Sequence, residues 1–196
     1  TSRPDLTREA DLIEEVLRLW GMDRVEPTLP AAKNHHGGLT VDQQRTQLIG
    51  RTLRACGLSE TFTYCFAEDG DLERANVTET GRGVPVRIKN PLLANNSEMR
   101  RSILPGLLRS VAYNLDHGVP NVALYEIGRV FYGHESKSQP DEPTYVCGVL
   151  AGKRADDGWN AKFPEYDFFD AKGAVEQLLS ALRLTKVRFK VADPKK

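Results

Sequence analysis

The sequence predicts an α+β fold, in which helices pack on an antiparallel sheet. Apolar residues recur with a 3.6-residue period in some segments and alternate with polar residues in others. From residue 41 onwards, the predicted elements follow in the order helix, strand, strand, helix, strand, strand, helix, strand. Neighbouring strands with short connections are typical of antiparallel sheets, whereas a doubly wound fold would alternate strands with helices.

The first element is a helix over about residues 7–20. Thr7 or Asp5 can cap its start, and Gly21 ends it. Its apolar residues fall on one face at helical spacing, namely Leu12, Ile13, Val16, Leu17 and Trp20. The Pro/Gly-rich stretch that follows predicts a linker. We therefore expect a small helical segment at 1–26, a linker at 27–39 and a main domain at 40–196.

The main domain contains the other predicted elements. In chain order they are a helix over 41–57, strands over 61–66 and 84–90, a helix over 103–118, strands over 121–133 and 144–152, a helix over 167–184 and a strand over 186–191. Phe62, Tyr64 and Phe66 alternate along the first strand, which predicts that it is half-buried. Pro105 suits the first turn of its helix and Gly118 its end.

The composition is that of a folded globular protein, with 40% hydrophobic and 28% charged residues. The 27 basic and 27 acidic residues cancel, so any contact with RNA would need a local basic patch. No apolar run is long enough to span a bilayer. Cys56, Cys65 and Cys147 form no CxxC pair, which favours reduced thiols in a cytoplasmic protein over a disulfide framework or a zinc site.

Acidic residues gather on the polar side of the first helix. At 100° per residue, Asp11, Glu14 and Glu15 lie within roughly 100° of arc, opposite the apolar face. One interpretation is a solvated face on which Glu14 pairs with Arg18. The other is a metal site, because hard cations such as magnesium bind clustered carboxylate oxygens. The spacing alone leaves both interpretations open.

Sequence motifs identify no catalytic centre. The chain has no GxxxxGK[ST], GxGxxG or GxSxG sequence, and its histidines lack the spacing of metal ligands. The helix predicted over 103–118 is unusual in having two apolar faces, formed by Leu104, Leu107, Leu108, Val111 and Leu115. One face suits the domain core. The other suits either the core or a partner subunit.

Four blocks of sequence resemble the β subunit of bacterial phenylalanyl-tRNA synthetase. In chain order they are "RPDLTREADLIEEVLRLWGMD", "NPLLANNSEMRRSILPGLLRSVAYNL", "ALYEIGRVF" and "DFFDAKGAVEQLL". The resemblance covers essentially the whole chain. It implies a class II synthetase-like antiparallel sheet flanked by helices, preceded by the end of a small helical, DNA-binding-like domain. "WGMDRVE" departs from the Tyr-Gly-Tyr-type sequence usual in the family.

The resemblance also implies a function. Members of the family form an (αβ)2 tetramer that attaches phenylalanine to tRNA(Phe) with ATP, and the α subunit performs the chemistry. The β copy of the class II fold is degenerate, and Arg129 lacks the FRxE-type context of an ATP-binding strand. We therefore expect an inactive chain that does not itself bind ATP and meets tRNA only through the holoenzyme. A self-sufficient class II ligase and a nucleic-acid-binding module are the alternatives.

The resemblance assigns two groups of residues. A magnesium site shared with the α subunit would use this chain's Asp5, Asp11, Glu14 and Glu15, which match the D-x5-D-x2-E-E pattern of the family. The block around the 103–118 helix would correspond to the class II interface motif. It places Met99, Arg100, Leu104, Leu107, Leu108 and Val111 at the subunit interface. We further expect the fold to continue beyond Lys196 and an editing domain to precede Thr1.

Overall fold

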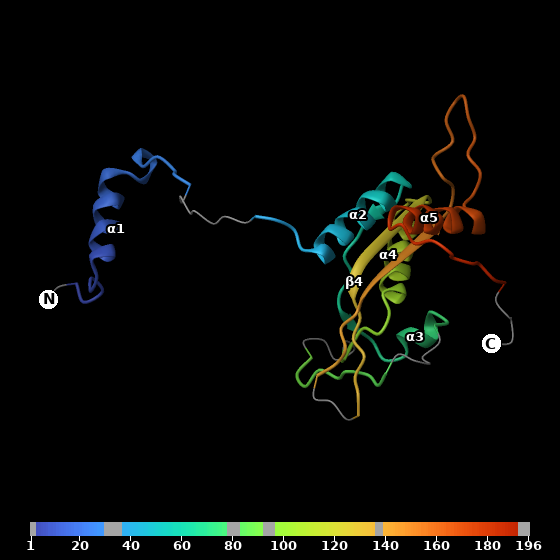
Figure 1. The fold of residues 1–196 in the computed structure, drawn as a ribbon, viewed down its shortest axis with the longest axis horizontal. Coiled ribbons are helices and arrows are strands. Elements are labelled where there is room, and N and C mark those ends of the chain that lie inside the picture. The colour runs from blue at the N-terminus through green and yellow to red at the C-terminus, as the bar shows by residue number, and fades with distance from the viewer. Residues whose placement is uncertain (1–2, 30–36, 78–82, 92–96, 136–138, 192–196) are drawn as a thin grey trace. The chain divides into compact units, whose positions relative to one another are not determined.

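The computed structural model describes residues 3–29, 37–77, 83–91, 97–135 and 139–191. The chain divides into two compact units, Thr1–Gly38 and Leu39–Lys196. Figure 1 shows both, with helices in each and the strands in the second. The α+β class expected from the sequence is confirmed. Of the expected linker, residues 30–36 lie outside the described part, and so do His35 and His36.

In the described part of the first unit, helix α1 (Glu9–Trp20) is followed by a 3-10 turn, η1 (Met22–Arg24). Gly21 ends α1 with a φ of 108°, a value that favours glycine, and its amide donates to the Leu17 carbonyl. No residue of α1 is buried in the described part of the chain, and Leu12, Ile13 and Val16 are all exposed. The amphipathic pattern therefore predicted the helix correctly, while its apolar face stays uncovered within the described residues.

The second unit has nine elements among the described residues. They are α2 (Val41–Ala55), β1 (Ser59–Glu60), β2 (Phe66–Ala67), α3 (Asp71–Arg74), β3 (Glu98–Met99), α4 (Leu104–Asp116), β4 (Val122–Arg129), β5 (Thr144–Ala151) and α5 (Phe168–Ala181). The helices expected over 41–57, 103–118 and 167–184 are confirmed. So are the two long strands, β4 and β5.

The main sheet has the strand order β1-β4-β5. β4 pairs antiparallel with β5, from Val122 opposite Ala151 to Arg129 opposite Thr144. β1 pairs parallel with β4, with Ser59 opposite Leu124, so the sheet is mixed rather than purely antiparallel. The parallel pair arises because the chain between β1 and β4 crosses over through α4, which returns it to the same strand direction. A second small sheet pairs β2 with β3.

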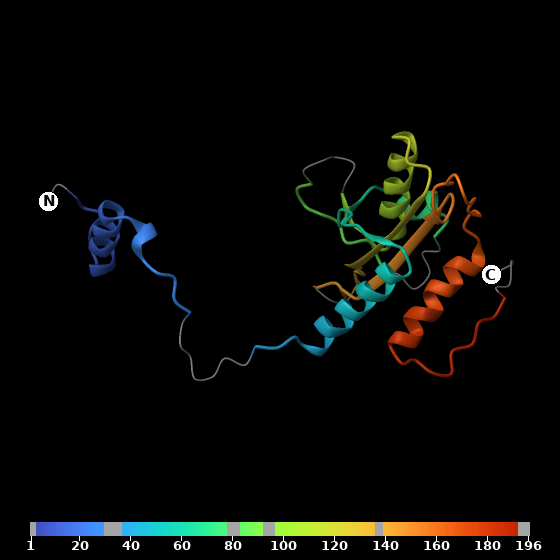
Figure 2. The ribbon, with the colours of Figure 1, turned by 90° about the horizontal axis from the view of Figure 1, so that it is seen from above.

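Helices cover both faces of the main sheet. Figure 2 shows α2 and α5 side by side on one face and α4 on the other. Alternate residues of β4 serve the two layers, because side chains of a strand point to opposite faces in turn. Tyr125 packs with Leu53 of α2 and Leu58, while Leu124 packs against Ile103, Leu107 and Val130 on the α4 face. The core therefore consists of two clusters, one on each side of the sheet.

Three predicted strands differ in the structure. Residues 61–65 form no regular strand, and residues 84–90 make only isolated bridges, at Val84 and Arg87. Residues 186–191 form no strand either. All three segments alternate in polarity, but a strand also needs a neighbour along its length. Among the described residues, β3 meets the second segment only at the Arg87–Glu98 bridge, and no described strand is paired along the full length of any of the three. An alternating sequence pattern does not show whether a segment has a neighbouring strand to pair with.

Candidate functional site

Asp11 caps the start of its own helix. Its Oδ2 atom accepts hydrogen bonds from the backbone amides of Arg8, at 2.8 Å, and Thr7, at 2.9 Å. Amides at a helix start have no partner within the helix, so a carboxylate satisfies them well. These bonds lower the pKa of Asp11. The sequence placed the cap on Thr7 or Asp5, but in the structure Thr7 donates its amide and Asp11 is the acceptor.

Asp5 and Glu15 share one guanidinium. Nη2 of Arg3 lies 2.7 Å from Oδ2 of Asp5 and 2.9 Å from Oε1 of Glu15. Arg18 binds the other oxygen of Glu15 at 2.6 Å. The pKa of Asp5 is lowered by its hydrogen bond with Arg3, and that of Glu15 by its hydrogen bonds with Arg18 and Arg3. Arg3, Asp5, Glu15 and Arg18 thus form one connected set of ion pairs, which we call the Arg3 cluster.

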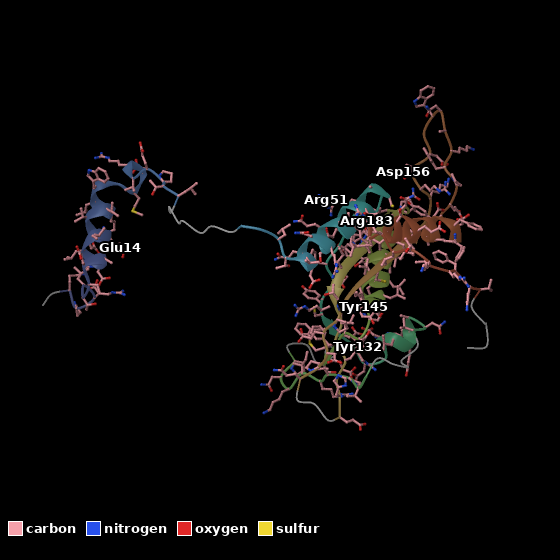
Figure 3. The ribbon with its side chains drawn as sticks, in the orientation of Figure 1. Glu14, Arg51, Tyr132, Tyr145, Asp156 and Arg183 are labelled. Carbon is pink, nitrogen blue, oxygen red and sulfur yellow. The ribbon has the colours of Figure 1, made fainter. Side chains whose placement is uncertain are left out.

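Glu14 stands outside the Arg3 cluster. Its side chain projects from α1 into solvent and has no hydrogen bond or ion pair within the described residues (Figure 3). The expected Glu14–Arg18 pair is replaced by Glu15–Arg18. Among the residues that the structure describes, no three His, Cys, Asp or Glu side chains are arranged to hold a metal ion. As arranged here, the four carboxylates therefore do not fit a magnesium ion.

The residues assigned to the subunit interface fall into two groups. Leu107 is 0% exposed, and Val111 and Arg100 are also buried, so all three belong to the interior of the second unit. Met99 and Leu104 are half-buried, and Leu108 is 40% exposed. Leu115, which lies two helical turns after Leu108 on the same side of α4, is exposed too. The apolar stripe of α4 is therefore buried along one side, at Leu107 and Val111, and accessible along the other, at Leu108 and Leu115.

A buried ion pair lies beneath α4. Nη1 of Arg100 lies 2.6 Å from Oε1 of Glu126, whose residue is only 1% exposed. The other oxygen of Glu126 accepts from the amide of Thr63 at 3.1 Å and from its hydroxyl at 2.6 Å. Nε of Arg100 donates to the Arg129 carbonyl. The charges are therefore fully paired, as burial requires. The sequence signal was a charged residue inside an apolar strand, "VALYEIGRVF".

Two glycines of the sequence motifs make room for this network. A Cβ at Gly128, in "EIGRVF", would collide with the guanidinium of Arg100 and lie 2.9 Å from Oε1 of Glu126. A Cβ at Gly106, in "LPGLL", would lie 2.5 Å from Oγ1 of Thr63. Both positions thus need glycine because a strand and a helix approach the same polar core closely. Packing therefore explains the glycine in each of these two motifs.

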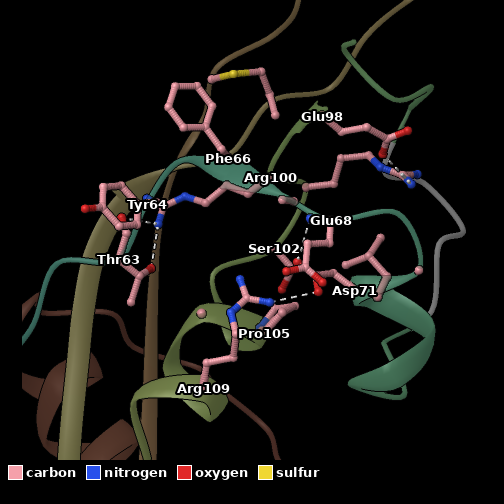
Figure 4. A pocket seen from close by; sticks show the side chains of 16 residues that line it. Thr63, Tyr64, Phe66, Glu68, Asp71, Glu98, Arg100, Ser102, Pro105 and Arg109 are labelled. Atoms are coloured by element: carbon pink, nitrogen blue, oxygen red, sulfur yellow. Dashed lines mark hydrogen bonds and ion pairs between the residues drawn. The ribbon is translucent and has the colours of Figure 1, made fainter. Parts of the chain in front are cut away.

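A second set of ion pairs lines the neighbouring cavity, which is shown in Figure 4. Asp71 accepts from Arg74 at 2.6 Å and from Arg109 of α4 at 2.8 Å. Burial would raise the pKa of Asp71, but the hydrogen bonds from Arg109, the Glu68 amide and Arg74 outweigh it and lower the pKa. The cavity has room of about 30 Å³, which is on the order of one water molecule and too little for an amino acid or a nucleotide.

Aromatic side chains line an open groove beside α4. Its volume is about 490 Å³, and its walls come from residues 60–68 and from α4. Phe62 and Tyr64 are each 83% exposed, and Tyr113 of α4 is exposed as well. Burial does alternate along residues 61–66, but the aromatic side chains lie on the exposed side of the segment and not on the buried side that we expected. Thr63 points inward to Glu126, and the aromatic rings point outward.

Arg129 lies in the strand that, by the resemblance, corresponds to one carrying an ATP-binding arginine in the family's α subunit, although it lacks the FRxE-type context. It lies at the end of β4 and pairs with Glu142 at 2.8 Å, with both side chains largely solvent-exposed. This ion pair lies on the surface and does not enclose a binding pocket. Within the described residues, Arg129 is therefore engaged in a surface contact.

Comparisons with known proteins decide the family. The sequence model described as "Phenylalanyl tRNA synthetase beta chain CLM domain" matches residues 25–196. The chain belongs to this family. The phenylalanine–tRNA ligase beta subunit of Geobacter sulfurreducens is 36% identical over 194 residues, and that of Bacillus licheniformis is 38% identical over 184. They cover 98% and 94% of this chain, which spans only 24% and 22% of their lengths.

Solved structures confirm the class II synthetase-like fold. Two structures of a pyrrolysyl-tRNA synthetase from Desulfitobacterium hafniense superpose with TM-scores of 0.53 and 0.51. They are 13% and 11% identical to this chain in sequence. Each superposition covers 73% of this chain, and it covers 47% and 45% of the respective synthetase chains. At such low identity the likeness shows the fold alone. No helix in the described ranges is long and apolar enough to cross a membrane.

Proposed function

We propose that this chain is a non-catalytic part of the β subunit of a phenylalanine–tRNA ligase. In this role it supports an α subunit that attaches phenylalanine to tRNA(Phe) with ATP. Membership of the β-chain family carries the proposal. The lack of an FRxE-type context around Arg129 supports a scaffold role for the strand. The intact enzyme works in the cytoplasm as an (αβ)2 tetramer and meets tRNA through its other domains.

The accessible face of α4 is the proposed contact with the α subunit. Leu104, Leu108 and Leu115 share that face, and Leu108 and Leu115 are exposed. An exposed apolar stripe beside a well-packed core is typical of a subunit interface. Leu107 contributes by packing α4 on the sheet, Val111 and Arg100 are buried, and Met99 is half-buried.

Magnesium is the proposed cofactor of the intact enzyme. Asp5, Asp11, Glu14 and Glu15 would be this chain's share of a site completed by the α subunit. Carboxylate oxygens are the ligands that magnesium prefers, and Glu14 is free to bind. The other three carboxylates must first give up the donors that hold them in this structure.

The partner contact is tested with Leu108→Glu in the intact β subunit. A buried charge at an interface is costly, so we expect the affinity for the α subunit to fall at least about tenfold, measured by gel filtration and sedimentation. Val175→Glu is the matched control, because Val175 of α5 is also apolar and similarly exposed. Unchanged affinity of Leu108→Glu, with a wild-type circular dichroism spectrum, would refute the α4 contact.

A further inference from the structure

The segment between β5 and α5 carries an exposed tryptophan. Residues 152–166 run out and back, with Lys153 and Glu165 paired in an antiparallel bridge, and we call this segment the 152–166 hairpin. Figure 1 shows it projecting beyond α2 and α5. Trp159 is 99% exposed, although tryptophan is highly buried on average in folded proteins. An indole so fully in solvent is typical of an anchor that a partner covers.

Hydrogen bonds across the 152–166 hairpin hold it in one shape. The amide of Gly158 donates to the Ala161 carbonyl at 2.9 Å, which closes the tip. Below the tip, Oδ1 of Asp157 accepts from the amide of Phe163 at 3.1 Å, and Oδ2 pairs with Lys153 at 2.7 Å. Further backbone hydrogen bonds join the two sides at the base. The tip is therefore pre-organised, and a preformed anchor loses little conformational entropy on binding.

The charges of the 152–166 hairpin balance. The segment contains three basic and three acidic side chains. Lys153 pairs with Asp157, and Arg154 pairs with Asp170 of α5 at 2.7 Å. A segment that binds the phosphates of RNA needs an excess of positive charge, which this one lacks. The indole of Trp159 therefore suits an apolar pocket on a protein.

The root of the hairpin adjoins the chain that follows α4. Oδ1 of Asn121 accepts from the amide of Lys153 at 2.7 Å, and Nδ2 of Asn121 donates to Oδ1 of Asp156 at 2.5 Å. A hollow of about 540 Å³ lies between this root and the chain after α4, and Val119 lines it. Val119 and Leu115 of α4 are both exposed. Apolar surface thus continues from the proposed α-subunit contact on α4 towards the hairpin.

We infer that the 152–166 hairpin is a second anchor on the α subunit, and that Trp159 inserts its indole into an apolar pocket of that subunit. This inference rests on the proposed function, which makes the α subunit the partner of α4. A partner seated on Leu108 and Leu115 reaches the hairpin root past Val119. Tryptophan is enriched among the few interface residues that contribute most of the binding free energy.

The test follows the dissociation of the intact α–β enzyme on dilution, measured by mass photometry. Trp159→Ala should raise the dissociation constant between the two subunits at least about tenfold, because a truncated tryptophan anchor leaves its pocket unfilled. Trp159→Phe keeps an aromatic ring and should raise the constant less. Asn160→Ala is the matched control, because Asn160 is the next exposed residue of the tip and should leave the constant unchanged.

Other outcomes would overturn the anchor. An unchanged dissociation constant for Trp159→Ala refutes it, and Leu108→Glu then decides separately whether α4 contacts the α subunit. If Trp159→Ala instead lowers only the unfolding midpoint of the β subunit, another part of that subunit covers the indole. If it raises only the KM for tRNA, the indole contacts RNA. If both Trp159→Ala and Leu108→Glu dissociate as wild type does, the proposed α-subunit contact fails together with the anchor.

Discussion

At the scale of single residues, the Arg100–Glu126 pair shows what the motifs of this family achieve in this chain. Arg100 follows β3, Glu126 lies in β4, and Thr63 lies between β1 and β2. These three segments are distant in the sequence, and the ion pair joins them inside the second unit. Gly128 and Gly106 leave the space that the pair and Thr63 require. The network is therefore a structural device that joins the β1–β2 connection and the segment after β3 to strand β4.

Glu126→Gln should destabilise the chain strongly. Glutamine keeps the volume but removes the charge that balances Arg100, and an unpaired buried charge costs about 3 kcal/mol or more. We expect the free energy of unfolding in urea to fall by about that amount. Glu142→Gln is the matched control, since the Glu142–Arg129 pair is on the surface and should change stability by less than about 1 kcal/mol. Equal losses for the two variants would contradict this role of burial.

At the scale of elements, α4 shows how much a pattern can predict. Its bounds, its proline in the first turn and its two apolar faces all follow from the sequence. Which face is buried does not, because helical periodicity describes the helix and not its neighbours. The sheet covers Leu107, which packs with Val130 and Val149, whereas Leu108 is left accessible on the neighbouring side of the helix.

The two faces of α4 should differ in their effect on stability. Leu107→Ala removes a fully buried side chain and leaves a cavity, so we expect a loss of about 3 kcal/mol in the free energy of unfolding. Leu108→Ala, one residue along, should cost less than about 1 kcal/mol in the isolated chain. Urea unfolding monitored by circular dichroism measures both. A Leu108→Ala loss as large as that of Leu107→Ala would place Leu108 in the core.

The segment 61–66 and the acidic face of α1 show what the sequence could not predict. Alternation at Phe62, Tyr64 and Phe66 predicted a half-buried strand, but Glu126 needs a polar partner and binds Thr63 instead. The rings therefore face outward. Like-charge spacing on α1 predicted a cluster, yet not that Arg3 folds back from outside the helix to pair with it. In both cases a contact between distant residues decides the outcome.

At the scale of the whole molecule, a class II synthetase-like fold persists in a chain whose polar core is used for packing. The described cavity beside Arg100 has room for about one water molecule, and Arg129 pairs with Glu142 on the surface. The long strands β4 and β5 and the covering helices keep the architecture of the class, as the superposition with a pyrrolysyl-tRNA synthetase shows.

Phenylalanine-dependent ATP–pyrophosphate exchange tests the central claim most directly. The purified chain, shown to be folded by circular dichroism, should give no exchange above the level without enzyme. The positive control is an α subunit combined with a complete β subunit that includes this chain, which should give exchange. Exchange that depends on phenylalanine and on this chain alone would contradict the scaffold role and identify a self-sufficient ligase instead.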